Sequence, residues 1–232
     1  MVTDAARLQL LDRAIRSGYR LVNSKFPPIS LFDDVADQDE FELLFELQAL
    51  TNPRQQNEVG NLNLLPADQI PFGITGCSYA VAPFTHVNPD GSRFSDGQSG
   101  VLYIADQIET ALAEVRYHQQ RYWERVQGLK FDRLVFRTLS CRFDASPLHD
   151  ATVLDSQHPI YNPDDYQAAR QLAAELRRQK SAALQYHSVR QPGSICWALF
   201  TPRSVLSIRQ TTHYEMIWNG SMISGVNRLV SG

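Results

Sequence analysis

Residues 100–124 combine a short apolar run with an amphipathic pattern that begins where the run ends, and the fold must accommodate both. Residues 100–105 read GVLYIA, which is typical of a buried strand. Residues 106–109 have the form of an aspartate-started capping box. An apolar stripe follows at helical spacing, formed by Ile108, Ala111, Leu112 and Val115. We therefore predict a strand that leads directly into a helix ending near residue 124.

Other strands and helices are predicted around this unit. Residues 132–143 and 195–200 have the pattern of strands, and residues 164–180 have that of a helix. Near the C-terminus, Asn219-Gly220 stands between two apolar runs, which indicates a β-hairpin. Because strands and helices are mixed without strict alternation, we predict a single compact α+β domain with a mixed sheet and flanking helices.

The N-terminal region is predicted to begin with a helix. Residues 3–17 have an amphipathic pattern that Gly18 could end, so residues 1–18 are expected to form an N-terminal helix ahead of a main domain over residues 19–232. Residues 38–50 also have a helical pattern. Residues 51–100 carry scattered proline, glycine and asparagine, and we expect them to form loops and a binding surface.

The composition narrows the class of protein. The chain has 232 residues, of which 43% are hydrophobic, so it can bury a sizeable core. Its net charge of −3 lacks the basic footprint of a nucleic-acid-binding protein, and no direct contact with nucleic acid is expected. It has no apolar signal core, no run long enough to span a membrane, and an odd number of cysteines. These features predict a soluble cytoplasmic protein with reduced thiols and no membrane contact.

Motifs of several common enzyme classes are absent from the sequence. There is no GxxxxGK[ST], GxGxxG, GxSxG or HExxH pattern. The six histidines have no metal-ligand spacing with one another or with the cysteines, so we expect no metal site. Cys196 stands in an apolar strand, which favours a buried small hydrophobic residue over a nucleophile.

Three polar groups interrupt the apolar patterns. Arg93 stands in the turn-rich loop over residues 91–97, Glu114 borders the apolar stripe of its helix, and Ser188 lies just before the strand at 195–200. Taken singly, each has an ordinary structural explanation as a solvated loop arginine, an ion-paired edge glutamate or a turn-capping serine. Together they suggest that arginine, tyrosine, glutamate and serine side chains from distant parts of the sequence meet at one site.

These segments resemble the RES-domain family. Residues 91–95, 101–105 and 110–114 are similar to its central signature, which is a Gly-x-Arg loop, an x-Leu/Ile-Tyr-x-Ala strand and a Thr/Ala-Ala-x-x-Glu helix. Residues 186–193 resemble its C-terminal serine segment, and Tyr19-Arg20 resembles a Tyr-Arg pair near its N-terminus. The family is named for an arginine, a glutamate and a serine, and the matching positions are Arg20, Glu114 and Ser188.

The resemblance implies both a fold and an activity. It covers residues 19–205, departs from many members at Phe94-Ser95 and from some at Cys196, and makes residues 19–232 a RES-type catalytic domain. Such domains resemble ADP-ribosyltransferases in fold and act as toxins of type II toxin–antitoxin pairs, neutralised by an Xre-like helix-turn-helix antitoxin. They consume NAD by cleaving its nicotinamide–ribose bond and pass ADP-ribose to inorganic phosphate or water. A protein ADP-ribosyltransferase and a non-catalytic partner-binding domain of the same fold are the alternatives.

This chemistry assigns a role to each matching residue. Cleavage passes through an oxocarbenium-like centre, which the Glu114 carboxylate would stabilise. Arg20 and Arg93 would bind the diphosphate, and Tyr103 would stack on the nicotinamide or bond to a ribose hydroxyl. Ser188 would orient the nicotinamide ribose, and Arg190 would recruit phosphate. NAD is the substrate, and no further cofactor and no metal are expected.

Overall fold

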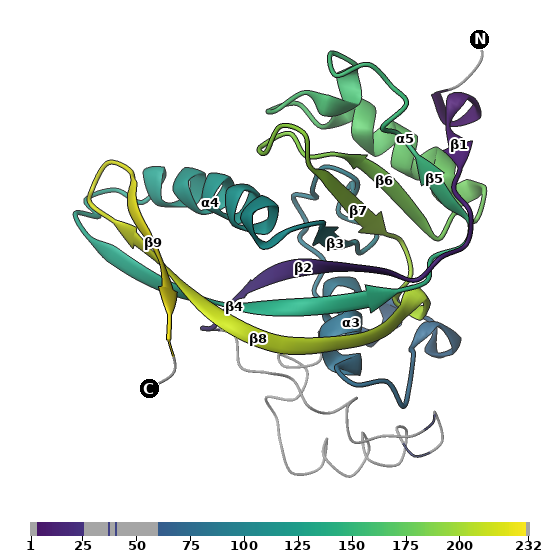
Figure 1. Cartoon of the computed structure of the whole chain (residues 1–232), viewed down its shortest axis with the longest axis horizontal. Coiled ribbons are helices and arrows are strands. Elements are labelled where there is room, and N and C mark those ends of the chain that lie inside the picture. Colours follow the sequence, from purple (N-terminus) through teal and green to yellow (C-terminus); the bar gives the residue numbers. More distant parts are fainter. Residues whose placement is uncertain (1–3, 26–36, 38–39, 41–59, 231–232) are drawn as a thin grey trace.

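A computed structural model describes residues 4–25, 37, 40 and 60–230, which form one nine-stranded sheet in the order β1-β5-β6-β7-β3-β2-β4-β8-β9 (Figure 1). Strands β5 and β6 are parallel, and the other neighbours are antiparallel. The predicted α+β class with a mixed sheet is therefore confirmed. The strands are β1 (Gln9–Leu10), β2 (Arg16–Asn23), β3 (Leu102–Ala105), β4 (Asp132–Phe143), β5 (Leu148–Asp150), β6 (Ala183–His187), β7 (Ile195–Leu199), β8 (Val205–Trp218) and β9 (Ile223–Leu229).

Helices cover both faces of the sheet, and the sheet separates the hydrophobic core into two clusters. The α-helices of the described residues are α3 (Cys77–Thr85), α4 (Ile108–Glu124) and α5 (Gln167–Arg178). Alternate residues of β3 point to opposite faces, with Leu102 and Ile104 in the core beneath α3 and Ala105 in the core beneath α4 and α5. The α3 side and the α4 side lie on opposite faces of the long strands β4 and β8 in Figure 1. Short 3-10 helices lie at Asp4–Arg7, Leu62–Leu64, Ala67–Gln69, Pro159–Tyr161 and Pro202–Ser204.

Several predicted elements are confirmed nearly to the residue. The apolar run at 100–105 contains β3, and the pattern after it forms α4. The strands predicted at 132–143 and 195–200 are β4 and β7, and the helix predicted at 164–180 contains α5. The Asn219-Gly220 pair turns β8 into β9, with the amide of Asn219 donating to the carbonyl of Met222.

The predicted N-terminal helix over residues 1–18 is wrong. A short 3-10 turn at Asp4–Arg7 is followed by β1 and then by β2, which pairs with β4 along its whole length. The apolar residues of that amphipathic pattern do not share one buried face, because Leu8 and Leu11 pack into different cores and Ile15 is 57% exposed. Sheet pairing has overridden a locally helical pattern.

The region predicted as loop also contains a helix. Helix α3 lies within residues 51–100 and begins after Gly76, whose φ of 77° places it in the left-handed region. Pro83 stands inside α3, so the sequence carries a helix-breaking residue where the structure is helical. The helix predicted at residues 38–50 lies outside the described residues, except for Glu40.

The sheet has a narrow junction between β2 and β3. These two fully described strands share a single register pair, Tyr19 with Ala105. On their other edges, β2 pairs with β4 and β3 pairs with β7 along the whole strand. Gly18 lies at this junction, and a Cβ atom there would stand 2.4 Å from the Ala105 carbonyl oxygen and 2.6 Å from Ile104 Cγ2. A glycine is therefore required for the two halves of the sheet to meet.

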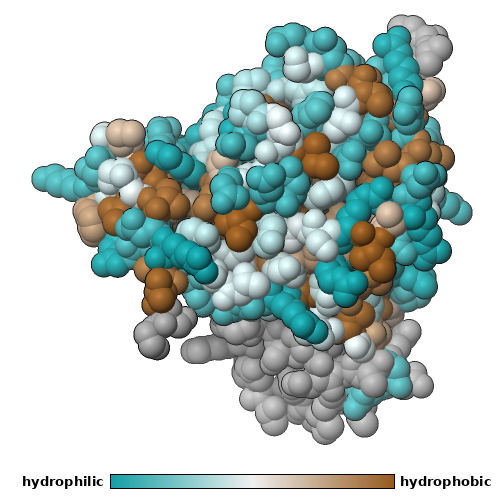
Figure 2. Space-filling model, viewed as in Figure 1, coloured by the Kyte–Doolittle hydropathy of each residue, from teal (hydrophilic) through white to brown (hydrophobic). Residues whose placement is uncertain are grey.

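One end of the sheet projects from the body as an arm (Figure 1). It consists of the C-terminal end of α4, the start of β4 and the β8–β9 hairpin (Figure 1). Apolar residues gather on it in Figure 2. Tyr122, Phe131 and Met222 are large hydrophobic residues of this region that are exposed by 63%, 60% and 47%.

We predict that Gly18→Ala lowers the free energy of unfolding by about 1–3 kcal/mol, because the added methyl must push β3 away from β2. Urea unfolding measures this change. Gly225→Ala is the matched control on β9, where the nearest atom to an added Cβ is 3.5 Å away. An equal loss of stability in both variants would contradict the close-approach explanation.

Candidate active site

A cavity of about 820 Å³ lies where β2 and β3 part. Strands β2 and β3, helix α4, the loop around residues 88–93 and the start of α5 all contribute to its wall. Four of the five residues predicted for the site line it, namely Arg20, Arg93, Tyr103 and Glu114. A volume of this size is in the range of small-molecule sites. The structure therefore brings together residues from four separate segments of the sequence.

The fifth predicted residue, Ser188, contacts the cavity through Glu114. Its hydroxyl donates to Glu114 Oε1 at 2.7 Å, across 74 residues of sequence. The hydroxyl oxygen of Ser188 itself accepts the backbone amides of Arg190 and Gln191 at 3.2 and 3.1 Å. Because two N–H groups occupy its lone pairs, the serine proton is directed at the carboxylate. Ser188 is buried and fixes one oxygen of Glu114, which leaves the other oxygen available to a ligand.

Asp106 fixes the start of the helix that carries Glu114. The predicted capping box is wrong, because the residue at the N-cap of α4 is Gln107 and its side chain makes no cap hydrogen bond. Asp106 instead accepts the Thr110 hydroxyl at 2.7 Å and the amide of Ile195 at 3.1 Å. One carboxylate thus ties the first turn of α4 to β7.

The loop over residues 91–97 closes on Tyr103. The Tyr103 hydroxyl accepts the Phe94 amide at 2.9 Å and bonds to Ser92 Oγ at 2.7 Å, and burial raises the pKa of this phenol. The hydroxyl is occupied within the protein, so the ring is the part of Tyr103 that remains for a ligand. Tyr186, which the sequence did not single out for the site, also lines the cavity and packs edge-to-face on Phe94 at 4.8 Å.

Arginines on α5 hold the same loop from behind. Arg170 donates to the carbonyls of Ser92 and Asp90, both at 2.9 Å, and Arg177 donates to that of Phe94 at 3.0 Å. Arg170 and Arg177 were not predicted as site residues from the sequence. The pattern that could have indicated them is their spacing of seven residues, which places both on the same face of α5.

The cavity wall carries uncompensated positive charge. Arg20 donates to the Tyr103 carbonyl at 3.2 Å, and Arg93 donates to the carbonyls of Ile160 and Asn162 at 2.9 and 2.8 Å. Within the described part of the chain, no carboxylate lies at ion-pair distance from Arg20, Arg93 or Arg170. Carbonyl dipoles orient a guanidinium without cancelling its charge, so the wall favours an anionic ligand.

The comparison with known proteins fits this geometry. The profile of the RES domain matches residues 70–219, which include Arg93, Tyr103, Glu114 and Ser188. This chain belongs to the RES-domain family. It is also 30% identical over 213 residues to an uncharacterized protein, y4oC, of Sinorhizobium fredii, covering 89% of this chain and 84% of that protein. Arg20 precedes the matched range of the RES domain, and the structure places it in the same cavity.

The C-terminal part of the segment over residues 160–166 borders the cavity and is held by two sets of contacts. Arg93 lies over the ring of Tyr166, 4.5 Å from its centroid. Two residues earlier, Asp164 accepts the hydroxyl of Tyr117 and a guanidinium N–H of Arg121. The guanidinium of Arg190 stacks on Tyr117 at 3.3 Å and donates to the carbonyl of Pro163.

This packing bears on the phosphate-recruiting role suggested for Arg190. Its guanidinium is committed to Tyr117 and Pro163, and Arg190 does not line the cavity. The geometry therefore favours a structural role for Arg190.

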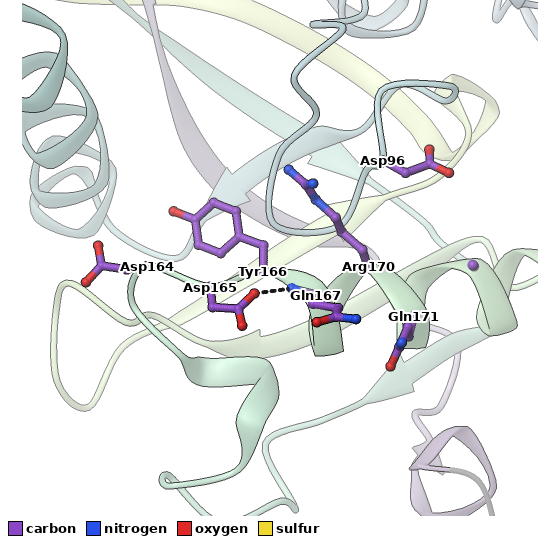
Figure 3. A pocket seen from close by; sticks show the side chains of 8 residues that line it. Asp96, Asp164, Asp165, Tyr166, Gln167, Arg170 and Gln171 are labelled. Carbon is purple, nitrogen blue, oxygen red and sulfur yellow. Dashed lines mark hydrogen bonds between the residues drawn. The ribbon is translucent and has the colours of Figure 1, made fainter. Parts of the chain in front are cut away.

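A second cavity of about 470 Å³ adjoins the first. Figure 3 shows Tyr166 and Arg170 pointing the same way from the start of α5, with Asp164 and Asp96 on either side. Asp164, Tyr166 and Arg170 line both cavities. This smaller cavity contains three aspartates and none of the predicted site residues, so the larger cavity is the better candidate for the RES active site.

The cysteines and the metal-ligating side chains of the described residues are further candidates for reactive groups. The three cysteines are buried free thiols, which confirms the predicted burial of Cys196, and this burial raises the pKa of its thiol. Among the described residues, no group of three or more histidine, cysteine, aspartate or glutamate side chains is placed to hold a metal ion. The helices of the described residues are too short or too polar to cross a bilayer.

We predict that Asp106→Ala lowers the free energy of unfolding by about 1–3 kcal/mol, because it leaves the buried Thr110 hydroxyl and the Ile195 amide without their acceptor. Thermal and urea unfolding measure the loss. Glu109→Ala, on the exposed first turn of α4, is the control and should change stability by less than about 0.5 kcal/mol. A neutral effect of Asp106→Ala would show that α4 is held by apolar packing alone.

Proposed function

We propose that this RES domain is an NAD-consuming toxin that cleaves the nicotinamide–ribose bond and transfers ADP-ribose to phosphate or water. The observation that carries the proposal is the hydrogen bond from Ser188 to Glu114, at the wall of a cavity lined by arginines. It joins the two residues that the family resemblance pairs, and it leaves one carboxylate oxygen facing a space large enough for a small molecule.

The arginines account for binding of the substrate diphosphate. Arg20 approaches the cavity from β2 and Arg93 from the facing loop, and the hydrogen-bond partners of both are carbonyl groups rather than carboxylates. A diphosphate between them would receive charge-assisted hydrogen bonds from both guanidinium groups. The ring of Tyr103 lies on the wall that would contact the nicotinamide.

Glu114 supplies the electrostatic part of the reaction. As the C1′–N bond breaks, its electron pair moves to the nicotinamide nitrogen, and positive charge develops at C1′ and the ring oxygen. A carboxylate held in place by Ser188 can bind a ribose hydroxyl and stabilise that charge without reorganising. In this proposal Ser188 is a positioning residue, because it acts through Glu114 and does not itself line the cavity.

The partner in this proposal is an Xre-like helix-turn-helix antitoxin. The net charge of −3 gives no support for nucleic-acid binding by the RES domain itself, which leaves operator binding to the antitoxin. The projecting arm, with Tyr122, Phe131 and Met222 exposed, offers an apolar surface for a protein partner.

We predict that the purified protein releases nicotinamide from NAD and that Glu114→Gln lowers the rate by about 100-fold or more, because the carboxylate charge is lost. Proton and phosphorus NMR with and without inorganic phosphate identifies the products. Glu109→Gln, on the same helix but away from the cavity, is the matched control and should keep wild-type activity.

The products separate the alternatives to this function. Radiolabel from NAD that appears on a protein would instead identify a protein ADP-ribosyltransferase. Intact NAD, together with cellular toxicity that Glu114→Gln leaves unchanged, would indicate a non-catalytic partner-binding domain.

We predict that Ser188→Ala lowers kcat by about 10-fold and leaves KM for NAD near the wild-type value, because the lost hydrogen bond holds the carboxylate and not the substrate. Steady-state kinetics of nicotinamide release test this split. Ser156→Ala, at an exposed position, is the control. A raised KM with unchanged kcat would argue for direct contact between Ser188 and the substrate.

A further inference from the structure

His118 lies on the cavity wall one helical turn beyond Glu114. Residues four apart on a helix are neighbours on the same face, with Cβ atoms about 5–6 Å apart. His118 is solvent-exposed, so its ring can meet a molecule that enters from the cavity mouth. Within the described part of the chain, neither ring nitrogen has a hydrogen-bond partner, and the ring contacts Tyr117 edge-on at 5.3 Å between centroids.

We infer that His118 is the general base that activates a water molecule for attack on C1′ of the bound ribose. This inference rests on the proposed function. As the nicotinamide leaves with the electron pair of the C1′–N bond, a water oxygen forms the new bond to C1′ and its proton passes to a ring nitrogen of His118. The products are nicotinamide, ADP-ribose and a protonated imidazole, which then releases its proton to solvent.

The division of labour between His118 and Glu114 follows from their surroundings. Glu114 already accepts the Ser188 hydroxyl and must stay charged to stabilise the cation, so it is poorly placed to take a proton as well. His118 has a nitrogen lone pair when neutral, and it lines the cavity from an exposed position where water can reach it. The two side chains therefore suit the two separate tasks of the reaction.

The surroundings of His118 favour the neutral ring. Its pKa is lowered, chiefly because the protein around the unexposed part of the side chain desolvates the imidazole. Among the charges, the Glu114 carboxylate raises the pKa, and the cations of Arg190, Arg93 and Arg121 lower it. These groups come from α4, from the loop before β3 and from the segment after β6. A lowered pKa leaves the base form in place at neutral pH, and activity is lost only as the pH falls through that pKa.

Comparing water with phosphate as the acceptor distinguishes a general base from a purely structural histidine. Inorganic phosphate at pH 8 is a dianion whose attacking oxygen carries no proton, so phosphorolysis needs no base. We expect His118→Gln to lower the rate of hydrolysis by about 100-fold or more and to leave the rate of phosphorolysis near the wild-type value. The fall in hydrolysis rate at low pH (the acid limb), which in the wild-type protein follows protonation of His118, should disappear. Nicotinamide release is measured across pH in phosphate-free buffer and in phosphate. His213→Gln, on β8 away from the cavity, is the matched control, and thermal unfolding checks that both variants are folded.

The other outcomes separate this inference from the proposed function. If His118→Gln lowers hydrolysis and phosphorolysis by the same factor, or leaves the acid limb in place, the base role is wrong. If the wild-type protein releases nicotinamide with phosphate but not with water, the base role is overturned and the NAD-cleaving function stands. If it releases none with either acceptor, the proposed function itself has failed.

Discussion

The contact between β2 and β3 at Gly18 is the constraint on which the site depends. The two halves of the sheet meet at one register pair, Tyr19 with Ala105, and then part. That parting opens the cavity and sets Arg20 on one side of it and Tyr103 on the other. A sheet with continuous pairing at this point would have closed the space with backbone hydrogen bonds, and the polar residues would have had no shared volume.

The second constraint is the positive charge of the cavity wall, which follows from the arginines' use of backbone carbonyls as hydrogen-bond partners. Arg93 and Arg170 use backbone carbonyls to fix their positions, and the carbonyls come from loops that those arginines thereby order. The same hydrogen bonds therefore build the wall and keep it cationic. Arg121, in contrast, is paired with the carboxylate of Asp164, so among these lining arginines it is the one whose charge is compensated by an ion pair between described residues.

Much of the fold could be predicted from local patterns, because some elements depend mainly on their own residues. The alternation of β4, the stripe of α5 and the Asn219-Gly220 turn are of this kind. The N-terminal segment could not be predicted, since its partners are β4 and β5, more than a hundred residues away. Helix α3 was missed because Pro83 is a local signal against a helix that tertiary packing tolerates.

The site was predictable only in part for the same reason. Glu114 and Ser188 each had an ordinary structural explanation on local grounds, and the resemblance to the RES family was needed to pair them. Asp106 was predicted as a helix cap, but one of its partners is an amide 89 residues later on β7. Arg170 and His118 belong to helix faces whose partners the sequence does not reveal.

The order of the strands also has a consequence for when the site comes into being. Strand β7 is inserted between β6 and β3, although it follows both in the sequence. Ser188 lies directly after β6, in the connection to β7, and Asp106 anchors α4 to the first residue of β7. During synthesis, the residues that hold Glu114 therefore leave the ribosome about eighty residues after Glu114 itself. A nascent chain that ends before β7 contains the cavity residues of β2, β3 and α4 but lacks the Ile195 amide that holds Asp106, so the surroundings of Glu114 are completed only after nearly the whole domain has been made.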